Sequence, residues 1–170
     1  MEYPAALEIA TRAQAALAPY CHRISIAGSV RRQRPQVKDI EIVALPLQEP
    51  SDLFGDDLVA HHGFCAVVNQ WRAIKGQPTG KYTQRRLPEG ITLDLFIADV
   101  DNWGLTLAVR TGSADFSHRV LATGWVKAGY TSLNGHLYRR GQRVPVREET
   151  DLFALVGVPW IEPSAREVTG

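Results

Sequence analysis

The chain has 170 residues, of which 45% are hydrophobic and 22% charged, and its formal net charge is +1. This is ordinary globular composition with enough apolar material for a core, and the net charge by itself argues neither for nor against a nucleic-acid partner. No apolar run approaches the length of a membrane span and no signal peptide is recognisable, so we expect a cytoplasmic protein with no membrane partner.

From the N-terminus, hydrophobic periodicity predicts a helix over residues 4–18 and then strands over 23–27 and 38–46. A Gly-Ser pair ends the first strand and begins a new element. A second helix is predicted over 57–73, and a hairpin over 71–86 is broken by the run Gly-Gln-Pro-Thr-Gly.

A further strand is predicted over residues 91–98, and helices over 101–109 and 115–128 follow it. Residues 130–146 indicate short strands with glycine turns, and a last helix over 148–156 ends at a glycine. The strand-rich part therefore ends near residue 100, where a boundary is expected.

Three acidic residues interrupt apolar strands. Asp39 and Glu41 alternate with isoleucines on one strand, and Asp94 is the single charged residue of the strand over 91–98. Residues two apart on a strand share a face, about 7 Å apart, and an acid on a neighbouring strand completes a triad. Close carboxylates repel one another unless cations neutralise them, and oxygen ligands suit Mg²⁺ or Mn²⁺. The alternative is that the acids face solvent on half-exposed strands.

A candidate phosphate site precedes these acids. Gly28 and Ser29 follow a strand, so the Ser29 hydroxyl and nearby backbone N–H groups are placed to bind phosphate oxygens if a helix begins there. Arg31 and Arg32 come directly afterwards and add charge-assisted contacts to a triphosphate. A Gly-Ser pair alone is a weak signal, but its combination with two arginines and an Asp-x-Glu pair is stronger.

Basic residues gather in two stretches, over 23–38 and 72–86, each with five basic residues and no acid. Such patches attract a polyanion even when the net charge is near zero. The alternative is two solvated hairpins or loops. Nucleic-acid contacts are expected from the second stretch and from the helix after residue 112, at Lys75, Lys81, Arg85, Arg86, His118 and Arg119.

The order Gly-Ser-Val-Arg-Arg at 28–32, Asp-Ile-Glu at 39–41 and Leu-Asp-Leu at 93–95 resembles the palm of the polymerase beta superfamily. The C-terminal half is similar to the thumb and closing tail of the DNA polymerase X family, in segments 111–116, 127–130, 134–138 and 148–161. Together these segments extend the resemblance over about residues 20–167.

The resemblance implies an α+β fold, with a nucleotidyltransferase palm of mixed β-sheet and helices over residues 1–105 and a small α/β thumb-like subdomain over 106–170. It implies a minimal template-directed DNA polymerase for gap filling or primer extension in DNA repair, with two divalent cations, Mg²⁺ or Mn²⁺. Its partners would be a nucleoside triphosphate and primer-template or gapped DNA, and the chain is expected to be a monomer. The alternatives are a nucleotidyltransferase with a non-DNA acceptor (a tRNA end, a protein or a small molecule) and a catalytically silent nucleic-acid-binding module.

By the same resemblance, Asp39, Glu41 and Asp94 are the catalytic, metal-binding carboxylates, and Asp94 accepts the proton of the primer 3′-hydroxyl. The expected nucleotide-binding residues are Gly28, Ser29, Arg32, Arg110, Thr111, Gly112, Ser113 and Ser117. The segment at Gly112 and Ser113 is expected under the incoming sugar, with a cis peptide bond.

Three departures from the family pattern change the expected properties. Val109 and Arg110 replace the Tyr-Phe pair that guards the sugar 2′ position, so sugar selection is in doubt. Val37 and Lys38 stand where a glycine usually precedes the first metal aspartate. The chain is also expected to lack the family's lyase domain and fingers, which would remove the lyase activity and high processivity.

The pair His61 and His62 is interpreted as a surface feature rather than a metal site, because adjacent residues of a helix do not share a face.

Overall fold

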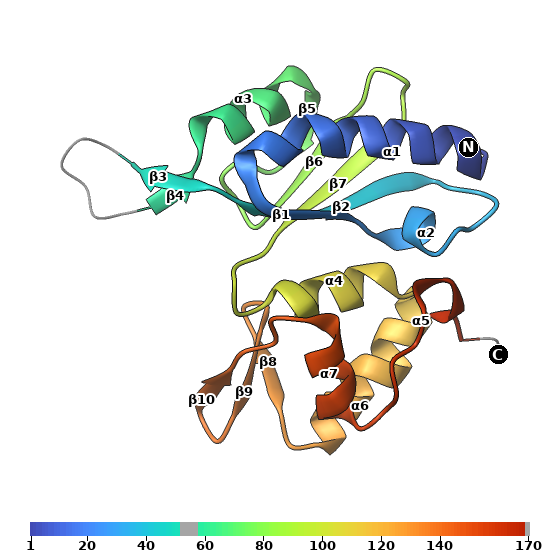
Figure 1. Cartoon of the computed structure of the whole chain (residues 1–170), viewed down its shortest axis with the longest axis vertical. Coiled ribbons are helices and arrows are strands. Elements are labelled where there is room, and N and C mark those ends of the chain that lie inside the picture. The colour runs from blue at the N-terminus through green and yellow to red at the C-terminus, as the bar shows by residue number, and fades with distance from the viewer. Residues whose placement is uncertain (52–57, 169–170) are drawn as a thin grey trace.

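The computed structural model describes residues 1–51 and 58–168, in which a mixed sheet lies above a helical part that carries a small second sheet (Figure 1). The main sheet has the strand order β1-β2-β7-β6-β5, and only β2 and β7 pair in parallel. Its strands are β1 (Cys21–Ile26), β2 (Asp39–Pro46), β5 (Arg72–Lys75), β6 (Tyr82–Arg86) and β7 (Thr92–Ile97). The mixed sheet with helices confirms the predicted α+β fold.

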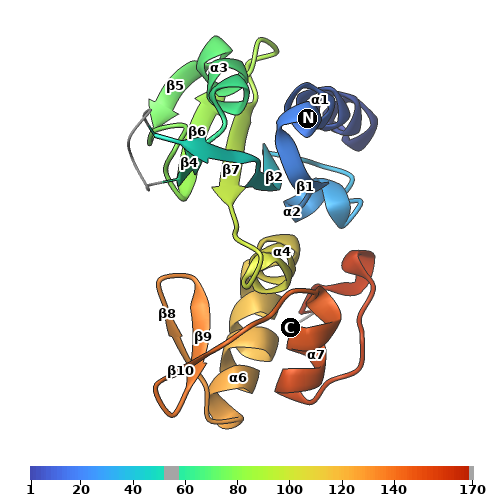
Figure 2. The ribbon, with the colours of Figure 1, turned by 60° about the vertical axis from the view of Figure 1, so that its left-hand side comes forward.

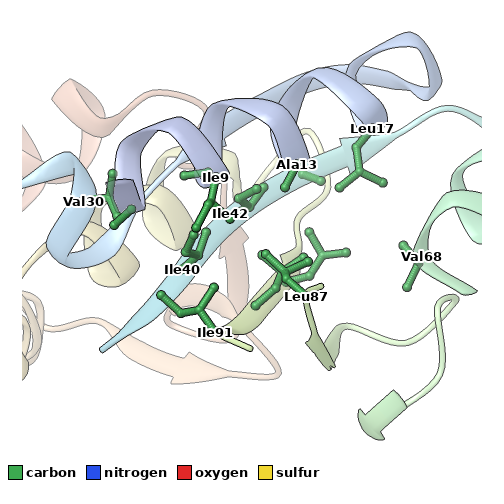
Figure 3. Packing of buried hydrophobic residues seen from close by; sticks show 14 of the residues in the cluster. Ile9, Ala13, Leu17, Val30, Ile40, Ile42, Val68, Leu87 and Ile91 are labelled. Carbon is green, nitrogen blue, oxygen red and sulfur yellow. The ribbon is translucent and has the colours of Figure 1, made fainter. Parts of the chain in front are cut away.

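Helices α1 (Tyr3–Leu17) and α3 (His62–Gln70) cover one face of this sheet (Figure 1). Figure 3 shows α1 placing Ile9, Ala13 and Leu17 above Ile40 and Ile42 of β2. These side chains are buried, and burial of each isoleucine or leucine among them stabilises the fold by about 1.5–3 kcal/mol. Because side chains alternate along a strand, Asp39 and Glu41 lie on the opposite face of β2.

The opposite face of the sheet packs on α4 (Trp103–Thr111), the first helix of the lower part (Figure 2). Val43 of β2 and Ala98 after β7 are buried there with Trp103 and Leu107 of α4. The acids therefore occupy the face of the sheet that is turned toward the lower part of the molecule.

The lower part has its own core between α4, α7 (Glu149–Val156) and the helical segments between them. The predicted helix over 115–128 is formed by α5 (Ala114–Phe116), a π-helical segment (Ser117–Ala122) and α6 (Thr123–Lys127). The small sheet of β8 (Thr131–Leu133), β9 (His136–Arg139) and β10 (Gln142–Val144) follows, with turns at the predicted glycines. Gly157 ends α7 with a φ of 75°, in the left-handed region that favours glycine.

The predicted helix over 57–73 is wrong at its start, although Asp57 itself lies outside the described residues. β4 (Leu58–Ala60) pairs with β3 (Gln48–Pro50), and α3 begins only at His62. The His61 side chain accepts a hydrogen bond from the Gly63 backbone N–H and caps α3 there. Short apolar runs fit a strand or a helix, and pairing with β3 decided this one.

Three short helices complete the described elements, namely α2 (Gly28–Arg31) and two 3₁₀ turns (Ala18–Tyr20 and Pro163–Ala165). Across the described part of the chain, none of the helices is both long and apolar enough to cross a membrane.

Candidate active site

The three acids predicted to act together lie on the two adjacent parallel strands. In the β2–β7 register, Glu41 is directly paired with Asp94, and Asp39 lies two residues earlier on the same face as Glu41. All three side chains are half-buried. Parallel pairing of β2 and β7 thus brings together residues that are more than 50 positions apart in the sequence.

The electrostatics of this face call for positive charge. Burial and then repulsion from Asp39 and Asp94 raise the pKa of Glu41 to about 7. Burial and then Asp94 also raise the pKa of Asp39. Arg110 and Arg32 oppose the rise at Glu41 but do not cancel it. Carboxylate oxygens that repel one another are a donor set suited to hard divalent cations such as Mg²⁺ or Mn²⁺.

The three acids are nevertheless spaced more widely than a preformed metal cage. Within residues 1–51 and 58–168, the only group of three or more His, Cys, Asp or Glu ligands with donor atoms all within 4.8 Å of one another is Glu49 with His61 and His62. Like charges favour such separation. Cation binding at the acids would therefore require their side chains to move together.

Gly28 is required by the approach of Glu41. Its φ is +59°, and a Cβ built on it would lie 1.8 Å from Oε2 of Glu41. The backbone is fixed at the same point, because the Ala27 N–H donates to the Glu41 carbonyl over 2.8 Å. A side chain at residue 28 would displace a carboxylate of the triad, which gives the predicted Gly-Ser pair a local physical reason.

Asp94 is held by two residues that the sequence interpretation missed. The Tyr82 hydroxyl donates to Asp94 Oδ1 over 2.6 Å, and Gln84 Nε2 donates to the same oxygen over 2.8 Å. Burial and then the bond to Asp94 raise the pKa of Tyr82 to about 12, so the phenol remains a donor. Both bonds go to Oδ1, which leaves Oδ2 as the oxygen free of these two contacts.

A polar cavity of about 320 Å³ adjoins the acids, within the size range of small-ligand sites. Its lining residues are Ser29, Arg32, Arg34, Gln36, Lys38, Asp39, Glu41 and Glu167. The Ser29 hydroxyl oxygen is buried and has no hydrogen-bond partner among the described residues. A buried polar group without a partner is costly, so a ligand oxygen that paired with Ser29 would be stabilised.

The two predicted arginines reach the lower part of the molecule. Arg32 donates from Nε to Glu167 and from Nη1 to the Thr111 carbonyl, each over 2.7 Å. Arg31 donates to the Thr111 hydroxyl over 2.7 Å and to both carboxylate oxygens of Glu149. Arg32 therefore lines the cavity but already has protein partners, and an anion in the cavity would compete with Glu167 for it.

The segment expected under the sugar lies between these arginines and α5. The Ser113 hydroxyl caps α5 by accepting from the Phe116 N–H over 3.2 Å, and the Ser117 hydroxyl donates to the Val109 carbonyl over 2.8 Å. The described residues contain no cis peptide bond, so that expectation for Gly112 and Ser113 is wrong for this structure.

Arg110, which was expected to bind the nucleotide, lies near the end of α4. Its guanidinium lies over the ring of Phe96 on β7, 4.0 Å from the ring centre. Phe96 in turn stacks on Tyr82, with 5.1 Å between ring centres. Arg110 thus approaches the face of the sheet that carries the acids, in agreement with its effect on the pKa of Glu41.

One of the residues predicted to bind nucleic acid does not reach the surface. Arg85 is only 1% exposed, and its Nη1 donates to the carbonyls of Lys75, Gly76 and Gln84. The prediction for Arg85 is wrong, because its guanidinium instead bonds to carbonyls at the end of β5, directly after it and in β6. The other predicted residues are exposed, namely Lys75, Lys81, Arg86, His118 and Arg119.

Comparisons with known proteins agree with this architecture. Residues 106–167 match the family described as the DNA polymerase beta thumb. A search of curated proteins by sequence found no match. Among solved structures, the chain is similar to polymerase beta of Leishmania infantum in a ternary P/T complex, with a TM-score of 0.71 and 19% identity over 98% of this chain and 76% of that one.

The acids lie on β2 and β7 and the Gly-Ser pair begins α2, all outside the segment that matches the family, whereas the structural likeness covers 98% of the chain. Residues 106–167 are therefore similar to the DNA polymerase beta thumb family, and the chain as a whole shares the fold of a polymerase beta.

Proposed function

We propose that this chain is a metal-dependent nucleotidyltransferase that acts as a minimal template-directed DNA polymerase, with a palm over residues 1–105 and a thumb-like subdomain over 106–170. The observation that carries the proposal is the cavity that joins Ser29 and Arg32 to Asp39 and Glu41. A phosphate-binding hydroxyl and guanidinium beside repelling carboxylates match the needs of a nucleoside triphosphate and its cations.

Asp39, Glu41 and Asp94 would hold two divalent cations, Mg²⁺ or Mn²⁺. When bound, such ions activate an attacking hydroxyl and stabilise a leaving pyrophosphate. In the proposed reaction, a new bond forms between the primer 3′-oxygen and the α-phosphorus while the bond to pyrophosphate breaks. Asp94 accepts the hydroxyl proton at Oδ2, and Tyr82 and Gln84 hold its other oxygen in place.

Ser29 and Arg32 bind the triphosphate in this proposal, and the segment from Arg110 to Ser113 supports the sugar. Phosphate oxygens would replace Glu167 on Arg32, because a doubly charged phosphate is a stronger partner than a single carboxylate. The Ser117 hydroxyl already donates its proton to the Val109 carbonyl, so toward an incoming base it can only accept a hydrogen bond.

Gapped or primer-template DNA would lie against the exposed basic residues Lys75, Lys81 and Arg86 of the palm and His118 and Arg119 of the thumb. Contacts between basic side chains and the DNA phosphate backbone contribute affinity without sequence preference, and they weaken as the salt concentration rises. Repair by gap filling is the proposed use, since few phosphate contacts favour short products.

Primer extension separates this function from the alternatives. A labelled duplex with a recessed 3′-end, all four dNTPs and Mg²⁺ or Mn²⁺ should give templated ladders. Nucleotide turnover without templated extension would instead indicate a non-DNA acceptor, such as a tRNA end, a protein or a small molecule. DNA binding without any turnover would indicate a silent binding module and would refute the proposal.

Sugar selection tests the role of Arg110. We expect a ribonucleotide to compete well with its deoxy counterpart on one primer, because no aromatic side chain stands at this position. Arg110→Ala should change the ratio of the two incorporation rates, with wild-type enzyme as the control. Strong selection for the deoxy form that persists in Arg110→Ala would assign the selection to the backbone near Gly112.

A further inference from the structure

Three potential metal ligands meet at the separate two-stranded sheet formed by β3 and β4. Glu49 lies in the middle of β3, and His61 and His62 stand directly after β4, at the start of α3. In Figure 1 this strand pair lies at the left of the molecule, whereas α2, which precedes the triad on β2, lies at the right. The cluster is therefore separate from the candidate active site.

The side chains of this cluster already face one another. His62 Nδ1 lies 2.9 Å from Glu49 Oε2, and His61 Nε2 lies 3.7 Å from the same oxygen. One donor atom from each residue lies within 4.8 Å of the other two. An ion with bonds of about 2.0–2.2 Å holds neighbouring donors about 3–3.5 Å apart, so the shift required is on the order of 1 Å.

We propose that Glu49, His61 and His62 form a second metal site, which takes a divalent first-row transition ion such as Zn²⁺. Two imidazoles and one carboxylate are typical ligands of Zn²⁺, whereas Mg²⁺ prefers oxygen ligands alone. The ion would link β3 to the start of α3. The interpretation of the two histidines as a surface pair assumed that both lie within one helix, whereas the His61 side chain caps α3 and only His62 belongs to it.

Part of the site is held in place by the surrounding backbone. The His62 N–H donates to Glu49 Oε1 over 2.7 Å, which fixes the carboxylate beside the ring. His61 stacks between Tyr20 and His62, with ring centres 5.6 and 4.2 Å away. Such contacts reduce the side-chain entropy that a metal would otherwise have to remove.

Metal binding makes a specific demand on His61. Its Nδ1 accepts a hydrogen bond from the Gly63 N–H over 3.0 Å, so in the neutral ring the proton sits on Nε2. A metal at Nε2 moves that proton to Nδ1, and a metal at Nδ1 takes its lone pair. In either case the Gly63 amide loses its acceptor, which gives a signal independent of activity.

The competing interpretation is an ion pair between protonated His62 and Glu49, without a metal. The two differ in the sign of their pH dependence. An ion pair strengthens when the histidine is protonated in acid, whereas a metal site weakens because its ligands must be deprotonated.

The test is titration of the whole protein with ZnCl₂ by calorimetry, in excess Mg²⁺ to occupy the triad. We expect one strong equivalent, at least about tenfold weaker in Glu49→Gln and in His62→Ala, and weaker at acid pH. His118→Ala, which removes an exposed histidine of the thumb, is the matched control and should retain the strong equivalent. Thermal unfolding verifies that each variant is folded.

In two-dimensional amide NMR spectra, Zn²⁺ should shift the Gly63 signal in the wild type and in His118→Ala but not in His62→Ala. Wild-type affinity in both Glu49→Gln and His62→Ala, or the absence of a strong equivalent in the wild type, would overturn the proposal. A contact between Glu49 and His62 that strengthens in acid, in a protein that does not respond to Zn²⁺, would also overturn the proposal.

Discussion

Half-buried Glu41 and buried Glu149, on opposite sides of the boundary between sheet and helices, have opposite electrostatic environments. At Glu41, burial and the neighbouring acids raise the pKa to about 7. At Glu149, burial also acts to raise the pKa, but hydrogen bonds from Arg31 and then Arg166 outweigh it and lower the pKa. The comparison separates a carboxylate that lacks a cation from one whose cations are built into the fold.

The Glu149 cluster is closed by protein groups alone. Arg166 is 0% exposed, donates to Glu149 and to the Ile161 carbonyl, and packs its guanidinium against the rings of Phe153 and Trp160. The second arginine bound to Glu149 is Arg31 of α2, so this cluster links the part of the molecule that contains the main sheet to α7. Arg166 Nη2 is buried without a hydrogen-bond partner in the described part of the chain, but the charges of this cluster are paired. Paired charges support structure, whereas repulsion left unbalanced in a polar cavity marks a site for ligands.

The largest expected effect tests the acids around Glu41, whose mutual repulsion is not balanced by protein cations. Asp94→Asn should lower turnover by at least roughly 10³-fold, about 4 kcal/mol in the barrier, because an amide neither accepts the proton nor neutralises a cation. Its Oδ1 can still accept from Tyr82 and Gln84, so nucleotide binding should remain measurable. Glu8→Gln, an exposed carboxyl-to-amide change on α1, is the control for primer-extension rates. Retained turnover in Asp94→Asn would contradict the proposed chemistry.

The next largest effect tests the charge-paired cluster of Glu149 with Arg31 and Arg166. Glu149→Gln should lower the free energy of unfolding by about 3–4 kcal/mol, because two arginines lose their shared carboxylate and one of them is fully buried. Urea unfolding measures this change. If Glu149→Gln had a free energy of unfolding close to that of the wild type, Glu149 would contribute no more to stability than a surface ion pair does.

Glu41→Gln should act in the opposite direction. In metal-free buffer near pH 8 it should raise the free energy of unfolding by about 1–3 kcal/mol, because it removes a repelled, partly buried charge. The folded pKa is above the ordinary value of 4.5, so the folded state binds more protons and wild-type stability falls as pH rises from about 4.5 to 7.

The gain from Glu41→Gln should therefore disappear below about pH 4.5, where the wild-type carboxyl is protonated in both states. Glu149 has the opposite sign: its stabilisation is complete above the unfolded pKa and is lost as pH falls through its lowered folded pKa. Thermal unfolding across this pH range distinguishes the two. A gain that does not vary with pH would show that the Glu41 charge is not its cause.

The smallest effect comes from an exposed ion pair beside Glu149. Glu148 accepts two hydrogen bonds from Arg23, but its side chain is 55% exposed. Glu148→Gln should cost less than about 1 kcal/mol in urea unfolding, since solvent screens exposed pairs. A cost equal to that of Glu149→Gln would remove the distinction between buried and exposed clusters.

The sequence was sufficient wherever a local pattern has one physical solution. The alternation of Ile40 and Ile42 with Asp39 and Glu41 fixed a strand with two different faces. The glycine at 157 correctly predicted the end of α7, because few other residues adopt its positive φ. At Leu58–Ala60 the local pattern had two solutions, and pairing with β3 selected the strand.

Tertiary structure alone decided which distant side chains meet. The register of β6 against β7 set Tyr82 and Gln84 beside Asp94, and nothing in the sequence specifies that register. Arg85 and Arg86 are adjacent in a basic run, yet strand alternation buries the first and exposes the second. The sequence by itself determined the periodicity of each element and thereby which residues share a face. The contact of Glu49 with His62 was decided by tertiary structure, because it depends on the register in which β3 pairs with β4.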